Sequence, residues 1–199
     1  MFVLIAGLVL FLGSHSVSIV APQWRDGMVA RLGEAPWKAA YGVIALVGFV
    51  LMVWGYGIAH PGSAPLFFLP PWLLGGLYWV NAVLMLAIFP MLLAAYLPGR
   101  IQTALKHPML AAVKVWALGH LLVNHTLVDV LLFGGLLAWA VVDRISIKRR
   151  EKVGMVTPPK MAPATALNDV IVIAGGLALY VAFVVGLHTW LFGVGVGVF

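Results

Sequence analysis

The stretch "AAYGVIALVGFVLMVWGYGIA", residues 39–59, runs for 21 residues without a single charge. An apolar run of about 20 residues is long enough to cross the hydrocarbon core of a bilayer as an α-helix. Further apolar runs lie at 2–21, 72–97, 107–124, 127–142 and 169–192. Pro90 falls inside the run at 72–97 and predicts a kink there. The sequence therefore predicts an all-α, polytopic integral membrane helical bundle of about six transmembrane helices.

The composition supports a membrane protein and excludes several kinds of site. The chain of 199 residues is 63% hydrophobic and 9% charged, with a mean hydropathy of +1.08. Soluble domains carry about 25% charged residues, so a packed soluble core is excluded. The chain has no cysteine, which excludes disulfides, thiolate metal ligands and the covalent attachment of a c-type haem.

The basic residues predict the topology. Lys and Arg lie in the loops after the first, third and fifth apolar runs, and only Lys114 lies inside a run. Cytoplasmic loops are enriched in Lys and Arg, so we expect six helices with both termini outside. The basic run "RISIKRREK" at 144–152 is interpreted as an anchor beside anionic lipid, not as a nucleic-acid site. It opens a cytoplasmic linker at about 144–168 within a single transmembrane domain over 1–199.

The histidines inside the apolar runs are the first candidates for a functional site, because ionisable residues within a membrane span are usually functional. His15 lies in the middle of the first run, in "GSHSVS". It is either a core histidine that bonds another helix, or a metal or haem ligand, a role that suits neutral imidazole. His60 and His188 lie near outer helix ends, where we expect interfacial residues.

The stretch "KHPMLAAVKVWALGHLLVNHTLVD", residues 106–129, carries an unusual set of polar side chains. At 100° per residue, Trp116, His120 and Asn124 share one face of the helix, whereas His107, Lys114 and His125 share another. Lys114 either reaches the cytoplasmic surface or pairs with an anion such as a lipid phosphate or a haem propionate. We expect the first face to line a pocket.

Depth along the helices suggests a pair of ligands. If the Lys114 head group marks the inner surface, His120 lies roughly 9 Å deeper. His15 lies seven residues before Pro22, which marks the inner end of its run, so its depth is similar. Two such histidines could hold one haem iron from opposite faces. If the helix instead enters the bilayer at His107, the two depths differ by roughly 10 Å and the pairing weakens.

Other polar residues have plainer interpretations. Asp129 lies at the start of the fifth run, where the helix macrodipole stabilises a carboxylate. Asn81 and Asn124 are expected to form hydrogen bonds between helices, each contributing about 1 kcal/mol or less. The arginines that end the fifth helix, Arg144, Arg149 and Arg150, could meet haem propionates.

Three segments carry a resemblance to a known family. "FLGSHS" at 11–16, "HPMLAAVKVWALGHLLVN" at 107–124 and "LLFGGLLAWAVVDRISIKRR" at 131–150 resemble the NnrU family of bacterial membrane proteins. That family is related to the plant 15-cis-ζ-carotene isomerase. The resemblance extends in order over nearly the whole chain, and the block of HP followed by W-x-x-x-H-x-x-x-N is its most specific part.

The resemblance implies a cofactor and candidate ligands. The plant enzyme carries haem b with two histidine ligands and isomerises a cis double bond of a conjugated polyene. By position, the ligands would be His15 and His120, and His107 matches a further histidine of the family. Where the plant enzyme has a cysteine, this chain has Ala117, so an exchange between thiolate and imidazole cannot occur here.

Several function classes stay open at this stage. The resemblance implies a haem-dependent cis–trans isomerase of a lipid-soluble polyene in the bacterial inner membrane, and a link to denitrification and nitric oxide metabolism. The alternatives are a non-catalytic haem-based redox protein or nitric oxide sensor, and an assembly or regulatory factor. A membrane methyltransferase of the isoprenylcysteine type is a further alternative, because "KHPML" loosely resembles the RHP block of those enzymes. The sequence leaves the oligomeric state open.

Overall fold

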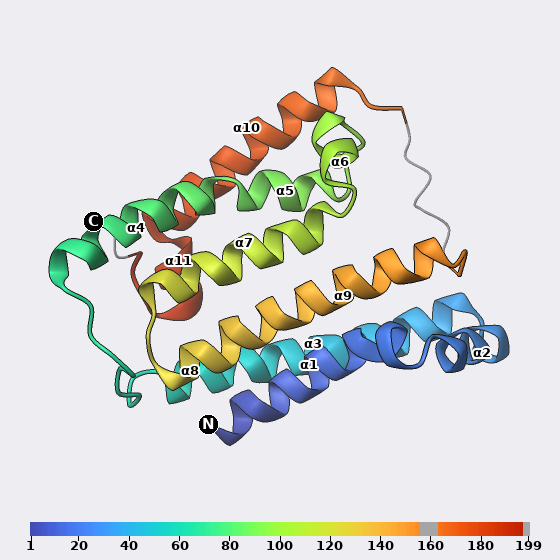
Figure 1. Ribbon diagram of the computed structural model, residues 1–199, viewed down its shortest axis with the longest axis horizontal. Coiled ribbons are helices and arrows are strands. Elements are labelled where there is room, and N and C mark those ends of the chain that lie inside the picture. The colour runs from blue at the N-terminus through green and yellow to red at the C-terminus, as the bar shows by residue number, and fades with distance from the viewer. Residues whose placement is uncertain (156–162, 197–199) are drawn as a thin grey trace. The chain divides into compact units, whose positions relative to one another are not determined.

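The structure, a computed structural model, describes residues 1–155 and 163–196 (Figure 1). Its described residues form helices and no β-strand. Five helical segments are long and apolar enough to cross a membrane, and one shorter apolar helix joins them: Phe2–Val20, Glu34–Ala59, Pro71–Ala94, Leu127–Lys152, Ala166–Phe192 and the shorter Pro108–Val123. The prediction of a helical membrane bundle is confirmed.

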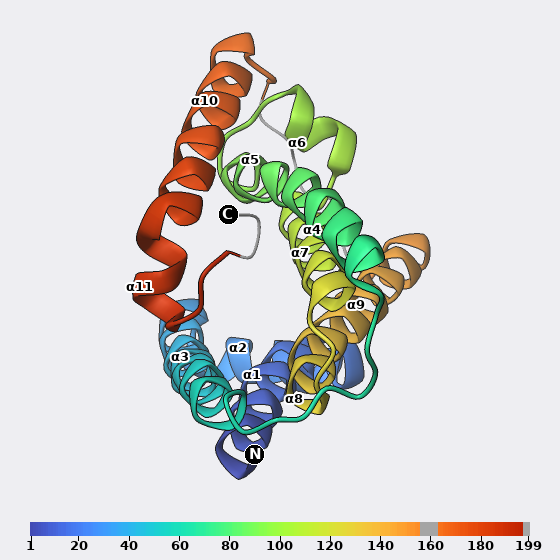
Figure 2. The same ribbon diagram turned by 90° about the vertical axis from the view of Figure 1, so that its left-hand side faces the viewer.

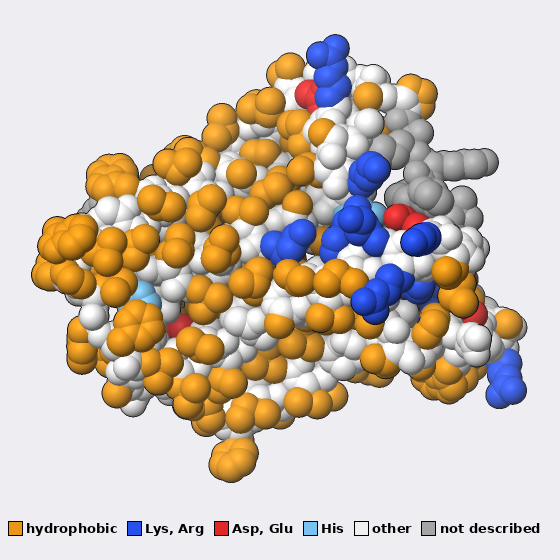
Figure 3. Space-filling model, in the orientation of Figure 1, with side chains coloured by type: hydrophobic (Ala, Val, Ile, Leu, Met, Phe, Trp, Pro, Cys, Tyr) orange, Lys and Arg blue, Asp and Glu red, His pale blue; other side chains and the backbone are white. Residues whose placement is uncertain are grey.

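The surface of these helices suits lipid. Only 11–22% of the most apolar window in each long segment is buried within the protein. Large side chains such as Phe2, Val185 and Trp190 are almost fully exposed. Hydrophobic side chains cover most of the face that Figure 3 shows, whereas Lys and Arg gather around the C-terminal half of helix α9 (Gly135–Lys152). A surface of this kind is stable only in contact with an apolar solvent.

The described residues group into two compact units, each built from separate stretches of the chain. Unit 1 comprises Met1–Ala64 and Thr126–Val156, and unit 2 comprises Pro65–His125 and Thr157–Phe199. Unit 1 contains α1 (Phe2–Val20), α2 (Pro22–Leu32), α3 (Glu34–Ala59), α8 (Leu127–Asp129), the π-helical turn η1 (Val130–Gly134) and α9 (Gly135–Lys152). Unit 2 contains α4 (Pro71–Leu86), α5 (Ile88–Ala94), α6 (Arg100–Leu105), α7 (Pro108–Val123), α10 (Ala166–Ala182), the π-helical turn η2 (Phe183–Leu187) and α11 (His188–Phe192).

In unit 1, α1 and α3 pack together through glycines. Gly48 and Gly55 lie seven residues apart on one face of α3, and a Cβ at either position would run into the backbone of α1. Gly7 of α1 faces the backbone of Met52 in the same way. Small residues let membrane helices approach until their backbones are in contact, which maximises dispersion and weak hydrogen bonding. The glycines therefore set the spacing of this helix pair.

In unit 2, a proline interrupts the first long segment as predicted. α4 ends at Leu86 and α5 begins at Ile88, because Pro90 has no N–H to donate and its ring clashes with the carbonyl four residues earlier. The Pro90 ring packs against Gly176 of α10, where a Cβ would collide with it. Figure 2 shows α10 running beside α5 in this unit.

Two segments are more helical than the sequence indicated. The expected loop after the first span contains α2, and α9 continues to Lys152, so the first part of the predicted linker, 144–152, is helical. The basic residues in the last turn of α9 stabilise the negative end of the helix dipole. Gly154, with φ 71°, then ends the helix, and Met155 N–H donates to the Arg150 carbonyl over 2.9 Å. The Pro-rich part of the predicted linker lies largely outside the described residues.

Candidate functional site

His15 lies in the C-terminal half of α1, half-buried among aromatic rings of unit 1. Its Nδ1–H donates to the Phe11 carbonyl, one turn earlier, over 2.7 Å. Because a carbonyl can only accept, this hydrogen bond places the proton on Nδ1 and the lone pair on Nε2. The rings of Phe11, Tyr41 and Trp139 lie 4.2, 5.3 and 5.5 Å from the imidazole, centroid to centroid. This tautomer leaves Nε2 available to a ligand, and the role of His15 as a metal or haem ligand stays a prediction.

Trp139 adds an unusual feature beside His15. Its ring, on α9, meets the imidazole edge to face at 85°. The indole Nε1–H is buried, and none of the described residues accepts a hydrogen bond from it. Buried polar groups nearly always have a partner. An acceptor on a bound group would satisfy this donor, which no pattern in the sequence predicted.

His120, on α7 in unit 2, has the same local arrangement as His15. Its Nδ1–H donates to the Trp116 carbonyl four residues earlier over 2.9 Å. The Trp116 ring lies 4.9 Å from the imidazole and also packs against the buried cluster of Ile88, Met91 and Ala112. Trp116 is therefore part of the core of unit 2, and its role in lining a pocket stays a prediction.

Asn124 does not form the bond between helices that the sequence predicted. Its side-chain amide donates to the His120 carbonyl over 2.9 Å, within the same helix end. The same carbonyl also accepts from the Asn124 backbone N–H over 2.9 Å, so the side chain bonds within its own helix end and does not reach another helix. Asn81 also differs from the prediction, because its Oδ1 is buried beside Gly119 and accepts no hydrogen bond from the described residues.

His188 lies next to His120, although the sequence indicated only an interfacial residue. The centroids of the two rings are 6.5 Å apart and their planes differ by 21°. The Nδ1–H of His188 donates to the Val194 carbonyl over 2.7 Å, because Gly193, with φ 71°, turns the chain back. The π-helical turn η2 directly precedes His188 and changes the direction in which it projects, and π-helical turns are often found at functional sites.

The remaining predicted residues lie at the start and middle of α7. His107 is the N-cap of α7, and Pro108 occupies the first position of the helix. Lys114 is half-buried, and no carboxylate among the described residues forms an ion pair with it. The chain described here therefore supplies no anionic partner for Lys114, which is compatible with either predicted role.

Asp129 of unit 1 is buried and contacts several polar side chains. The sequence predicted its position at a helix start but not its contacts with α3. It forms the predicted helix-start contact, a capping box in which its carboxylate accepts from Thr126 N–H and Oγ1–H over 2.8 and 2.7 Å. The Tyr56 hydroxyl of α3 also donates to Asp129 over 2.7 Å, and His60 Nε2 lies 3.4 Å from the same oxygen. Asp129 is 0% exposed, and these donors compensate for the loss of its hydration. His60 is thus part of a structural cluster.

The described residues contain no group of three His, Asp or Glu side chains that could hold a metal ion. A haem needs only axial ligands, and the candidates His15 and His120 belong to different units. Their pairing on one iron stays a prediction.

Helices of this length, with so little of their surface buried, define a multi-pass helical membrane protein. Within that class, the chain matches the family model described as NnrU protein over residues 3–196 and belongs to that family. Comparison with curated proteins and with solved structures found no match.

Proposed function

We propose that this member of the NnrU family binds haem b in the bacterial inner membrane, with His15 and His120 as its axial ligands. The observation that carries the proposal is the matched bonding of the two imidazoles. In each, Nδ1–H donates to the carbonyl one turn earlier, at 2.7 and 2.9 Å. Histidines that bind iron usually donate their other N–H to a carbonyl or carboxylate, which fixes the tautomer and orients the ring.

The surroundings of both residues fit a large, flat, apolar cofactor with an acidic edge. Aromatic rings flank both imidazoles, and the buried Trp139 N–H needs an acceptor. Lys114 could neutralise a propionate, as the sequence predicts. When bound, haem would supply a one-electron redox centre or a Lewis acid. The residues of this chain would orient the ligating imidazoles and exclude water from the iron.

An optical experiment tests the proposal. We expect the full-length chain, purified in detergent after expression with haem supply, to show sharp α and β bands on dithionite reduction, typical of low-spin haem b. His15→Ala and His120→Ala should each lose those bands and lower the haem content. His125→Ala is the matched control, because His125 bonds the Leu122 carbonyl through Nε2, at 3.1 Å, and not through Nδ1. Full haem content in both ligand variants would refute the proposal.

His188→Ala belongs in the same series. His188 is the histidine that the structure brings within 6.5 Å of His120, centroid to centroid. If His188→Ala loses the low-spin bands and His15→Ala retains them, the second ligand is His188. The opposite result assigns that role to His15, as the sequence predicts.

The finer function remains a prediction from the family. Conversion of a cis-polyene by the haem-loaded protein would identify an isomerase. Binding of nitric oxide without conversion would identify a sensor or redox protein of nitric oxide metabolism. A chain that never takes up haem would favour an assembly or regulatory role, and the methyltransferase alternative would then require a test with S-adenosylmethionine.

A further inference from the structure

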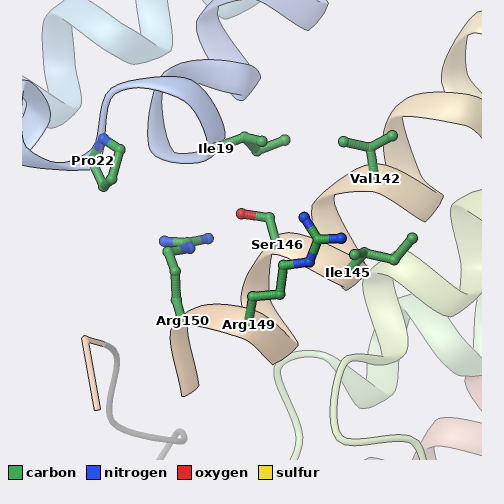
Figure 4. Close-up of a pocket in the computed structure, with 7 residues that line it drawn as sticks. All are labelled: Ile19, Pro22, Val142, Ile145, Ser146, Arg149 and Arg150. Atoms are coloured by element: carbon green, nitrogen blue, oxygen red, sulfur yellow. The ribbon is translucent and has the colours of Figure 1, made fainter. Parts of the chain in front are cut away.

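Unit 1 contains a pocket that the proposed haem site does not use. It has a volume of about 440 Å³ and lies where α1 ends, α2 begins and the basic half of α9 passes (Figure 4). Its apolar wall consists of Ile19, Pro22, Val142 and Ile145. The volume falls within the range of about 300–1,000 Å³ that is usual for small-molecule sites.

One face of α9 supplies the polar side of the pocket. Ser146, Arg149 and Arg150 line it, and their spacing of three and four residues places them on the same side of the helix. Figure 4 shows the Ser146 hydroxyl and the Arg150 guanidinium directed into the space below Ile19 and Pro22. The pocket therefore combines two cationic guanidinium groups and a hydroxyl with an apolar wall.

No residue that the structure describes neutralises these two guanidinium groups. The ion pairs of α2 and α3 join Arg25 to Asp26 and Lys38 to Glu34, and no described carboxylate forms an ion pair with Arg149 or Arg150. The Nε–H of Arg150 is buried, and no described atom accepts a hydrogen bond from it. A buried charged donor without an acceptor is unfavourable, so the pocket favours an anion.

The start of α2 adds to the positive potential. Pro22 occupies the first turn of this 11-residue helix, no side chain caps it, and the first turn has no acidic residue. The first N–H groups of a helix carry a partial positive charge and have no helical acceptors. Together with the two arginines, they favour an anion with several acceptor oxygens.

Phosphate has the geometry that this site favours. Arginine forms bidentate hydrogen bonds with phosphate oxygens, and it is the usual residue for phosphate recognition by a planar fork. The pocket lies where the apolar helix α1 ends, which is where the head groups of a bilayer would lie. A free phosphate ion would make no apolar contacts with the wall of the pocket. The glycerol and the first methylene groups of a lipid would pack against that wall.

We propose that this pocket is a specific site for the phosphate group of an anionic phospholipid, held by Arg149, Arg150 and Ser146 against the end of α1. The site is independent of the proposed haem ligands. Binding at this site differs from a general attraction of basic side chains to a charged membrane. It depends on two particular arginines and on the bidentate hydrogen bonds that their planar guanidinium groups can form.

A lipid titration by native mass spectrometry tests this proposal. The full-length protein in detergent is titrated with phosphatidylglycerol, phosphatidylcholine and inorganic phosphate. We expect phosphatidylglycerol to bind at least about tenfold more tightly than phosphatidylcholine. The variant Arg149→Gln/Arg150→Gln should lose about tenfold or more in affinity, since it lacks both charge-assisted contacts.

Two further variants separate a specific site from net charge. Lys148→Gln removes one positive charge from an exposed position of α9 outside the pocket and should change the affinity by less than about twofold. Arg149→Lys/Arg150→Lys keeps both positive charges but removes the planar guanidinium groups that bind phosphate in a bidentate way. It should therefore still weaken binding of phosphatidylglycerol. If the glutamine variant fails to fold, as judged by circular dichroism, the lysine variant provides the test.

Three outcomes would overturn the proposal. The first is an equal loss of affinity in Lys148→Gln and in the pocket variants, which would show that only net charge matters. The second is inorganic phosphate binding as tightly as the lipid, which would assign the site to a soluble phosphate. The third is displacement of bound lipid on haem loading, which would assign the guanidiniums to propionates.

Discussion

The Tyr56→Phe substitution would measure what a contact of the buried Asp129 contributes to stability. It removes one oxygen atom, whose hydrogen bond to the Asp129 carboxylate is 2.7 Å long. Hydrogen bonds to charged groups typically contribute about 1.5–3 kcal/mol, whereas hydrogen bonds between membrane helices average about 0.6 kcal/mol and reach about 1.7. Because the acceptor is a fully buried carboxylate, we expect the free energy of unfolding to fall by about 1.5–2 kcal/mol.

Tyr180→Phe provides the matched control. The Tyr180 hydroxyl is also half-buried and also bonds across helices, but it donates to the neutral carbonyl of Ala82 over 3.3 Å. Its loss should therefore cost about 0.6 kcal/mol or less. Both variants would be unfolded reversibly in mixed dodecyl maltoside and sodium dodecyl sulfate micelles, with helicity measured by circular dichroism. If Tyr56→Phe costs no more than Tyr180→Phe, the carboxylate does not have the role assigned to it.

Two predictions concern glycines that permit close approach. Gly55→Ala should destabilise the protein by about 1–3 kcal/mol in the same unfolding assay, because the new methyl group meets the Leu4 backbone. Gly57→Ala, where no atom lies within 4 Å, should be neutral or stabilising by up to about 1 kcal/mol, and a similar loss at both positions would contradict the packing of α1 on α3. Gly99→Ala should cost about 1 kcal/mol, because its Cβ would displace the Asp169 carboxylate that accepts from the first N–H groups of α6. In a variant that already carries Asp169→Ala, the Gly99→Ala substitution should lower the free energy of unfolding by little more. If the two losses instead add fully in the double variant, the two residues act separately.

The transmembrane segments were predictable because they depend on local properties. A run of about 20 apolar residues must form a helix in lipid, since no other structure satisfies its backbone hydrogen bonds. The interruption near Pro90 follows from the covalent structure of proline alone. The continuation of α9 through 144–152 was missed because a charged segment was interpreted as a loop, although Lys, Arg and Glu are good helix formers.

The contacts of the candidate sites were harder to predict because they join residues far apart in sequence. Tyr56 and Asp129 are separated by 73 residues, and their hydrogen bond depends on how α3 packs against α8. The position of His188 beside His120 depends on a π-helical turn and on the reversal at Gly193. A hydropathy pattern indicates which segments lie in lipid, but it does not indicate which faces of those segments meet.

The functional candidates and a structural histidine share one short local pattern but differ in their hydrogen bonds. Phe11, Tyr56 and Trp116 each lie four residues before a histidine, and the ring centroids in these three pairs are 4.2–5.0 Å apart. In the pairs that end at His15 and His120, Nδ1–H bonds the carbonyl of the aromatic residue, so each helix fixes the tautomer by itself.

The third pair behaves differently, and the difference lies in the partner. His60 directs Nε2 toward the buried Asp129 carboxylate at 3.4 Å, which uses for structure the nitrogen that a metal ligand would need. We therefore expect His60→Ala to lower the free energy of unfolding while leaving the haem spectrum unchanged. His15→Ala and His120→Ala should abolish the haem bands. In the haem-free protein they should lower the free energy of unfolding less than His60→Ala does, because their Nδ1 bonds are made within one helix. A loss of haem bands in His60→Ala without loss of stability would contradict this division.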